Sequence, residues 1–329
     1  LKKNCIYFSR DRVGEKPLYI SFNESSILFG SELISLTQFS SFNKDLSMSA
    51  LSSFFKFNYI PTPQTIYKST FKCPPGKFIC IDLNIFLFNK TYECFDDIFL
   101  DQGALIDDYW SSFPLLNQSE LLVEDFNQAS LRLEDIISKS VKDQLISDMP
   151  IGAFLSGGID SSLITALMQK ENMDKVKTFT IGFEDKRYDE SSYAREVANH
   201  LGTNHTELIL SQDDVINIIP NLSKIYSEPF ADSSQIPTLL VSKLAKSEVS
   251  VALSGDGGDE LFGGYNRYFL APTVWSILKK FPYSIRSFGA DIFLSSPNFL
   301  KGIENTSRFF YKKTPVQLVE KIQSLSSKV

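Results

Sequence analysis

The stretch of this 329-residue chain most suited to chemistry is the loop LSGGIDSS, from Leu155 to Ser162. It follows an apolar run, residues 151–155, that we expect to form a buried strand. It precedes an apolar helical face made of Leu163, Ile164, Leu167 and Met168. A loop that opens a helix presents unpaired backbone N–H groups and the positive end of the helix dipole. The sequence therefore predicts a phosphate site at this loop.

The side chains of this loop suit a phosphate that binds together with a metal ion. Gly157 and Gly158 allow a close backbone approach, and hydroxyl donors come from Ser156, Ser161 and Ser162. Asp160 would repel phosphate directly, and a Mg²⁺ ion between the two resolves that conflict. The alternative is a plain strand-to-helix turn with a serine cap. Neither the P-loop pattern nor the dinucleotide-binding pattern is present.

Two further loops follow predicted strands. The loop from Ser254 to Tyr265 (SGDGGDELFGGY) holds five glycines and three carboxylates in twelve residues, which suits Mg²⁺ shared with Asp160. A solvated acidic turn is the alternative. In the stretch FTIGF (179–183), Ile181 and Gly182 end a strand where an adenine could lie against the backbone. An ordinary buried strand end explains that pattern equally well.

Strands and helices alternate in the second part of the chain. We expect strands at 176–183, 206–210 and 248–253, and helices at 126–145, 189–201, 213–226 and 236–247. Asp189 should cap one helix and Gly202 should end it. This alternation predicts an α/β fold with a parallel sheet flanked by helices. Ligands bind beyond the carboxyl ends of such strands, so the loops after Leu155, Ile181 and Leu253 should converge.

The first part of the chain has a different organisation. We expect strands at 6–8, 18–22, 27–30 and 78–83, a short helix at 31–36 capped by Ser31, and a helix at 47–57. Residues 91–125 carry many aspartates with little periodicity and are interpreted as a linker. The predicted organisation is a first domain over 1–90, a linker over 91–125 and a second domain over 126–329.

Composition limits the partners and the compartment. A net charge of −6 and a pI near 5.2 argue against nucleic acid as a general partner. There is no apolar run long enough for a bilayer and no visible signal peptide. Four irregularly spaced cysteines (Cys5, Cys73, Cys80 and Cys94) indicate a reducing cytoplasm. The start at Leu1 rather than Met predicts a fragment or a trimmed chain.

Several motifs occur in the order found in one enzyme family. Early in the chain, RDRVGEKPLY (10–19), SEL (31–33) and PPG (74–76) resemble the closing part of a glutaminase domain. The three loops described above, SGGIDS, FTIGF and SGDGGDE with GGY, strongly resemble the asparagine synthetase B family. The resemblance covers most of residues 1–270. It implies an ATP-pyrophosphatase synthetase domain, preceded by the C-terminal portion of an α+β N-terminal-nucleophile glutaminase domain.

The resemblance implies a ligase that uses ATP and Mg²⁺ to convert aspartate into an acyl-adenylate, which ammonia from glutamine then attacks. It assigns Asp160 and Asp259 to Mg²⁺, Asp256 and Glu260 to catalysis, and a larger set to ATP and pyrophosphate: Leu155, Ser156, Gly157, Gly158, Asp160, Ser161, Ser162, Ile181, Gly182, Ser254 and Gly255. The acceptor substrate would meet Asp232, Ser233, Ser234, Gly264 and Tyr265. Small molecules are the expected partners, without nucleic acid or membrane, and a homodimer is left open.

Some positions depart from the family pattern and keep alternatives open. Asp256 stands where well-known members carry Glu. Its shorter side chain suits another acceptor, such as a sugar acid in surface-polysaccharide synthesis. The family has a catalytic lysine further along the chain, and no lysine here can be assigned to it, since Lys301, Lys312 and Lys313 lack a supporting motif. Cys5 has no α-amino group of its own, so we expect no glutamine hydrolysis by the family route. A non-catalytic ATP-binding protein is a further alternative, and a dinucleotide oxidoreductase is disfavoured by the missing glycine pattern.

Overall fold

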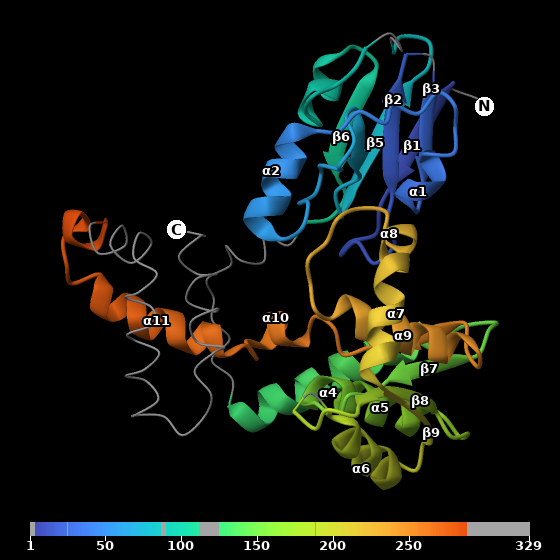
Figure 1. Ribbon diagram of the computed structural model, residues 1–329, viewed down its shortest axis with the longest axis vertical. Coiled ribbons are helices and arrows are strands. Elements are labelled where there is room, and N and C mark those ends of the chain that lie inside the picture. The colour runs from blue at the N-terminus through green and yellow to red at the C-terminus, as the bar shows by residue number, and fades with distance from the viewer. Residues whose placement is uncertain (1–3, 25, 87–89, 112–124, 188, 288–329) are drawn as a thin grey trace.

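The computed structural model describes residues 4–24, 26–86, 90–111, 125–187 and 189–287, most of which form two lobes (Figure 1). We call residues 4–111 the first lobe and residues 125–287 the second lobe. The residues beyond 287, among them Lys301, Lys312 and Lys313, lie outside the described part of the chain. None of the described helices combines the length and apolar composition needed to cross a bilayer.

The first lobe contains two three-stranded antiparallel sheets. One has the order β1–β5–β6 and the other β3–β2–β4. Its elements are β1 (Cys5–Ser9), β2 (Tyr19–Asn23), β3 (Ser26–Gly30), α1 (Leu33–Leu36), α2 (Met48–Phe57), β4 (Thr70–Lys72), β5 (Lys77–Asp82), η1 (Asp96–Leu100) and β6 (Ala104–Asp108). Apolar side chains of both sheets and of η1 form one buried core that includes Phe8, Ile20, Phe22, Ile79, Ile81 and Ile98.

Ile79 lies at the centre of this core and gives a test of it. Its side chain is fully buried on the middle strand of the β1–β5–β6 sheet. We expect Ile79→Ala to lower the free energy of unfolding of the first lobe by about 2–5 kcal/mol, because a buried aliphatic side chain is lost and a cavity remains. Urea unfolding followed by circular dichroism measures the change. Ile85→Ala, at a half-exposed position of the same lobe, is the control and should shift the transition far less.

The predicted linker over 91–125 is wrong for the part that the structure describes. Residues 96–100 form η1, whose Ile98 is fully buried in the first-lobe core, and β6 pairs with β5 along its whole length. The acidic end of β6 is explained by its partner strand, because Lys77 lies opposite Asp108 and their side chains are 2.6 Å apart. Because two charged residues end this short strand, its sequence lacks the alternation of apolar and polar residues by which a strand is predicted.

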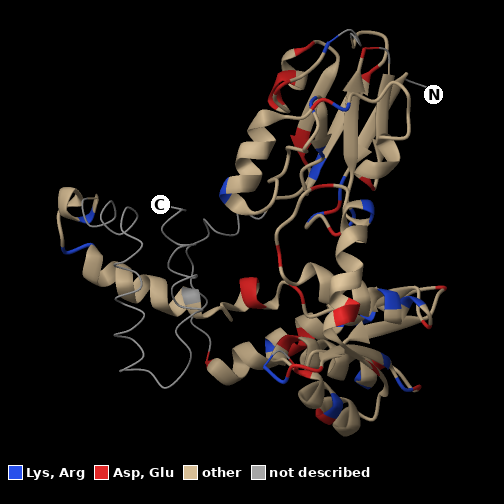
Figure 2. Ribbon diagram, in the orientation of Figure 1, with Lys and Arg blue, Asp and Glu red and all other residues tan. Residues whose placement is uncertain are grey.

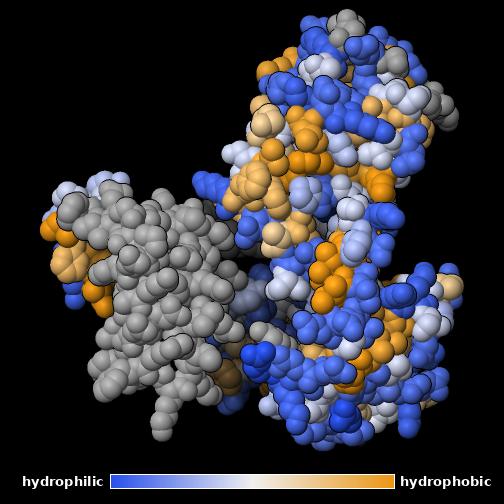
Figure 3. Space-filling model, viewed as in Figure 1, coloured by the Kyte–Doolittle hydropathy of each residue, from blue (hydrophilic) through white to orange (hydrophobic). Residues whose placement is uncertain are grey.

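Other first-lobe predictions are confirmed with small changes of boundary. The predicted strands correspond to β1, β2, β3 and β5, and the helix at 47–57 is α2, capped by the Ser47 side chain. The predicted cap at Ser31 is wrong, because the N-cap of α1 is Glu32, which makes no side-chain capping bond. β4 was not anticipated. α2 carries exposed apolar side chains, Met48 and Phe55 among them, and Figure 3 shows a hydrophobic area over this part of the first lobe.

The second lobe is built on a four-stranded parallel sheet with the order β10–β7–β8–β9, which confirms the predicted fold class. The strands are β7 (Ile151–Phe154), β8 (Lys177–Phe183), β9 (Asn204–Leu210) and β10 (Val251–Leu253). The helices are α4 (Phe126–Gln144), α5 (Ile159–Glu171), α6 (Ser191–Leu201), α7 (Gln212–Ile218), α8 (Leu222–Ile225), α9 (Gln235–Lys246), α10 (Gly258–Phe262) and α11 (Asn266–Leu278), with the 3-10 turn η2 (Ile219–Asn221).

Helices cover both faces of this sheet. On one face α4 and α5 pack on β7 through Val141, Leu167 and Ala153, and α6 packs beside them against Leu155. On the other face α9 packs on Phe154 and Phe179, which lie side by side on β7 and β8. This alternation places the ends of β7, β8 and β10 at one edge, where their following loops must meet.

Four elements of this lobe differ from the expectation by more than one residue, and one of them is β9, which begins at Asn204 rather than at residue 206. The helix predicted at 213–226 is divided into α7, η2 and α8 around Pro220, which has no N–H group for a continuous helix. The strand predicted at 248–253 is limited to residues 251–253. The N-cap of α6 is Glu190 rather than Asp189, although Asp189 Oδ1 still accepts a hydrogen bond from Ser191 N (3.1 Å). Gly202 ends α6 in the left-handed conformation, as predicted.

Candidate functional site

A cavity of about 970 Å³ lies at the carboxyl ends of β7, β8 and β10. All three loops singled out in the sequence line it, and α9 completes one side. The lining residues that sequence analysis had named are Leu155, Ser156, Gly158, Asp160, Ser161, Ile181, Ser254, Gly255, Asp256, Asp259, Glu260, Gly264 and Tyr265. The parallel topology therefore brings the three loops together, as expected from the alternation of strands and helices.

The first loop is held by bonds between its own serines. Ser161 Oγ lies 2.9 Å from Ser156 Oγ and accepts a hydrogen bond from Ser156 N. Gly158 N donates in turn to Ser156 Oγ (3.2 Å). Gly157 adopts φ +80°, and a Cβ atom there would lie 2.6 Å from Ala194 N at the start of α6. The loop is thus fixed in one conformation at the N-terminus of α5, where helix N–H groups lack intrahelical partners.

The second loop, from Ser254 to Tyr265, packs directly against the first turn of α5. A Cβ atom on Gly255 would lie 2.6 Å from Ser161 N and 2.8 Å from the carbonyl carbon of Asp160. A Cβ atom on Gly258 would lie 2.5 Å from Cγ of the Asp160 side chain. At Gly255 the neighbouring atoms are helix backbone, which cannot shift as a side chain can, so a larger residue does not fit there. The glycines of this loop therefore serve close packing that brings Asp160 beside the loop that carries Asp259.

The end of β8 is tied to β7 and to the start of α6. Thr180 Oγ1 donates a hydrogen bond to Leu155 O at the start of the first loop. Asp189 Oδ1 accepts from Phe183 N (3.3 Å) and from Ser191 N (3.1 Å). Its hydrogen bonds, first among them the one with Ser191, hold the pKa of Asp189 below its usual value. These bonds fix the end of β8 and the loop that follows it, which is the third loop of the site, relative to the first loop.

Five carboxylates give the cavity an acidic lining: Asp160, Glu190, Asp256, Asp259 and Glu260. Among the lining side chains that the structure describes, there is no lysine, arginine or histidine. The acidic α10, which carries two of them, is visible in Figure 2. An anion with several charges would be repelled by such a surface unless cations accompany it. The charge of the site therefore favours ligands that bind together with a divalent metal.

Some of these carboxylates are already oriented by neighbours. Asp256 Oδ2 accepts a hydrogen bond from Ser254 Oγ (3.1 Å), and Glu260 Oε1 accepts one from the hydroxyl of Tyr265 (2.6 Å). Within the described residues, no three Asp, Glu, His or Cys side chains gather closely enough to hold a metal by themselves. This donor set suits Mg²⁺, which commonly takes one or two carboxylates and fills its other positions with phosphate oxygens and water.

Other residues named from the sequence lie outside the lining. Gly157 packs against α6, and Gly182 packs against Ile209 and Asp189. Ser162 Oγ is buried and has no hydrogen-bond partner within the described structure. Asp232, Ser233 and Ser234 precede α9 and do not line the cavity; Asp232 Oδ1 instead accepts bonds from Ser234 N and Oγ. The nearby helix α9 lines it through Pro237, Thr238 and Val241.

Sequence reasoning missed several polar lining residues, namely Thr180, Glu190 and Thr238. Thr180 lies inside the FTIGF stretch and was overshadowed by Ile181 and Gly182. Glu190 directly follows Asp189 at the start of α6, so its position beside the capping residue was a signal for it. Thr238 belongs to the first turn of α9 and had no local motif. Its place at the cavity depends on how α9 packs on the sheet.

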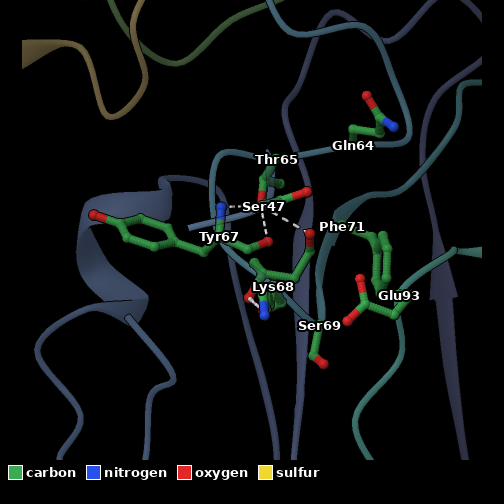
Figure 4. A pocket seen from close by; sticks show the side chains of 9 residues that line it. Ser47, Gln64, Thr65, Tyr67, Lys68, Ser69, Phe71 and Glu93 are labelled. Carbon is green, nitrogen blue, oxygen red and sulfur yellow. Dashed lines mark hydrogen bonds between the residues drawn. The ribbon is translucent and has the colours of Figure 1, made fainter. Parts of the chain in front are cut away.

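A second cavity lies in the first lobe and is far smaller, about 10 Å³ (Figure 4). Its polar lining is satisfied internally, because Thr65 Oγ1 donates to Thr70 O (2.8 Å) and accepts from Tyr67 N (3.2 Å). A space of this size holds about one water molecule. It is therefore no candidate for a substrate site.

Comparison with known proteins gives two family matches. The family described as asparagine synthase matches residues 132–325, and the glutamine amidotransferase domain matches residues 1–92. The chain is 34% identical over 310 residues to a Methanocaldococcus jannaschii protein provisionally named asparagine synthetase [glutamine-hydrolyzing] 2, covering 92% of this chain and 55% of that protein. It is 34% identical over 266 residues to asparagine synthetase [glutamine-hydrolyzing] 1 of Bacillus subtilis, covering 80% of this chain and 38% of that protein. The chain thus spans about half the length of these relatives or less.

Proposed function

Because this chain belongs to the asparagine synthase family, we propose that its second lobe activates a carboxylate with ATP and transfers ammonia to it. The carboxylate oxygen attacks the α-phosphorus of ATP, and pyrophosphate leaves. Ammonia then attacks the acyl carbon of the acyl-adenylate, and AMP leaves with both electrons of the broken C–O bond. The observation that carries the proposal is the single cavity lined by the three loops around the N-terminus of α5.

The first loop supplies the pyrophosphate site in this proposal. Its serines are fixed by their mutual hydrogen bonds, and it opens the 13-residue helix α5. Donors fixed in this way stabilise the charge that develops on a leaving pyrophosphate without reorganising during the reaction. Leu155, Ile181, Ser254 and Gly255 line the same cavity and would contact the nucleotide in this proposal. An adenine could lie against the apolar end of β8.

Asp160 and Asp259 would hold Mg²⁺, which neutralises phosphate charge when it is bound. The fit rests on the close packing of Gly258 against the Asp160 carboxyl group, which places two acidic loops side by side. Asp256 and Glu260 are then free of the metal role. In the second step, one of these two carboxylates accepts the proton that ammonia loses as the amide forms.

Aspartate is the acceptor that we propose first. Its ammonium group is attracted by a lining of five carboxylates, whereas a sugar acid has no positive charge to offer. A sugar acid or another carboxylate remains the second candidate, favoured by the short side chain of Asp256 where the family resemblance leads us to expect Glu. With a working domain of the kind that residues 1–92 match, the nitrogen would come from glutamine.

ATP–pyrophosphate exchange tests this function. The full chain is incubated with ATP, Mg²⁺ and labelled pyrophosphate, with aspartate or with a panel of sugar acids as the acceptor. We expect exchange that depends on one of these carboxylates. If the protein binds ATP·Mg²⁺ in a filter assay but supports no exchange with any acceptor, it is a nucleotide-binding protein without this activity.

A further inference from the structure

One segment of the second lobe reaches the first lobe and is held there. We call residues 227–231 the inter-lobe segment; it follows α8 and precedes the turn at Asp232 that leads into α9. Figure 1 shows α8 directly beneath the first lobe. Hydrogen bonds and an ion pair join this segment to three separate parts of the first lobe.

Backbone and hydroxyl groups make two of these contacts. Ala231 N donates to Asn58 O (2.8 Å), and Asn58 is the left-handed C-cap residue that ends α2. Ser227 Oγ accepts a hydrogen bond from Ile34 N (3.2 Å) in the first turn of α1. Both ends of the inter-lobe segment are therefore fixed to helix termini of the first lobe.

The central contact is an ion pair between the lobes that is largely covered from solvent. Glu228 Oε2 lies 2.5 Å from Lys72 Nζ, and the two side chains are only 11% and 16% exposed. Glu228 Oε1 accepts a hydrogen bond from Ile66 N (2.8 Å), and Lys72 Nζ also donates to Ile60 O (2.8 Å). Burial, followed by the charge of Glu228, raises the pKa of Tyr19. Removing one partner of such a pair leaves the other charge buried and uncompensated.

The inter-lobe segment continues directly into the side of the candidate site that belongs to α9. The Tyr226 hydroxyl, just before the segment, donates to Gln235 O (2.8 Å) in α9, and Gln235 Nε2 donates back to Phe230 O (3.3 Å). The first turns of α9 then supply Pro237 and Thr238 to the lining of the cavity. A displacement of the inter-lobe segment would therefore also displace the α9 side of the cavity.

From these contacts we propose that Glu228 is a positioning residue through which the first lobe sets the acceptor side of the ligase site. The inference rests on the proposed function for its kinetic consequence, but not for its structural one. Glu228 is not among the residues that line the cavity. Its pairing with Lys72 holds residues 227–235 in place. It thereby fixes the start of α9, which forms the side of the cavity where we propose that the acceptor carboxylate binds.

The test uses the full chain with Glu228→Gln, Lys72→Met and the double variant. Ammonia serves as the nitrogen source, so that glutamine hydrolysis plays no part. We expect each single variant to raise the KM for the acceptor about tenfold, with a change of less than about twofold in the KM for ATP. The double variant should be no worse than Lys72→Met alone, because the two residues form one pair. Lys77→Met is the matched control, since its partner Asp108 belongs to the same lobe, and it should leave both constants unchanged.

Hydrogen exchange provides a readout that does not depend on the reaction. The variants at 72 and 228 should speed the exchange of amides in residues 226–236, while amides of α5 keep their protection. Equal changes in both KM values, or unchanged exchange in residues 226–236, would overturn the positioning role. If the unmodified chain shows no ligase activity while exchange responds as expected, the proposed function fails and the structural coupling stands.

Discussion

Replacement of Asp160 by asparagine is expected to reduce ATP–pyrophosphate exchange about 100-fold or more, since it removes one electrostatic contact to the transition state. Asp160 belongs to the first turn of α5, and its carboxyl group lies against the second loop at Gly258. Asparagine has nearly the same volume, so the close packing of the two loops is preserved. The loss of one negative charge should weaken Mg²⁺ binding and leave the pyrophosphate charge less well neutralised.

The measurement is exchange at several Mg²⁺ concentrations, together with thermal unfolding of the variant. We expect the midpoint of unfolding to change little, because the side chain supplies a metal ligand and no core volume. Asp143→Asn, at an exposed position of α4, is the matched control, and its rate of ATP–pyrophosphate exchange should equal that of the unmodified chain. Normal exchange by Asp160→Asn at low Mg²⁺ would contradict the metal assignment.

The second large effect is expected at Gly255. A valine there would place its Cβ atom 2.6 Å from Ser161 N, and a helix backbone cannot move aside as a side chain can. The second loop must then separate from α5, which disperses the carboxylates that now face the first loop. We expect the affinity for ATP·Mg²⁺ to fall about tenfold or more, because misplaced groups lose most of their binding contribution.

Equilibrium binding of a fluorescent ATP analogue with Mg²⁺ measures this loss. Gly202→Ala serves as the control for a glycine substitution away from the site, because no atom lies within 4 Å of a Cβ atom there. Its left-handed conformation costs that variant about 1 kcal/mol of stability, while nucleotide binding should persist. If Gly255→Val binds ATP·Mg²⁺ with unchanged affinity, the second loop has no part in the nucleotide site.

Local sequence patterns predicted the parts of the fold that depend on near neighbours. The β-branched run before Phe183 gave β8, the apolar spacing after Asp125 gave α4, and Gly202 gave the end of α6. β4 and β6 were missed because each is a short strand stabilised by a distant partner. β4 pairs with β2, about fifty residues earlier, and β6 relies on β5 and on the Lys77–Asp108 pair.

The candidate site shows the same division. Motif residues such as Ser156, Asp160 and Gly255 could be placed in one cavity from the sequence, because the carboxyl ends of parallel strands share an edge. Thr238 and Glu228 could not. Thr238 reaches the cavity through the packing of α9, and Glu228 finds Lys72 in the other lobe, 156 positions away in the chain. No local periodicity carries information of that kind.

Transfer of ¹⁸O from a labelled acceptor carboxylate tests the central claim most directly. If the cavity joins the carboxylate to the α-phosphorus, one labelled oxygen must appear in AMP when ammonia displaces the adenylate. Mass spectrometry of the products should therefore show singly labelled AMP together with unlabelled pyrophosphate. ADP with labelled phosphate, or AMP without any label, would contradict the proposed cleavage of ATP between its α- and β-phosphates.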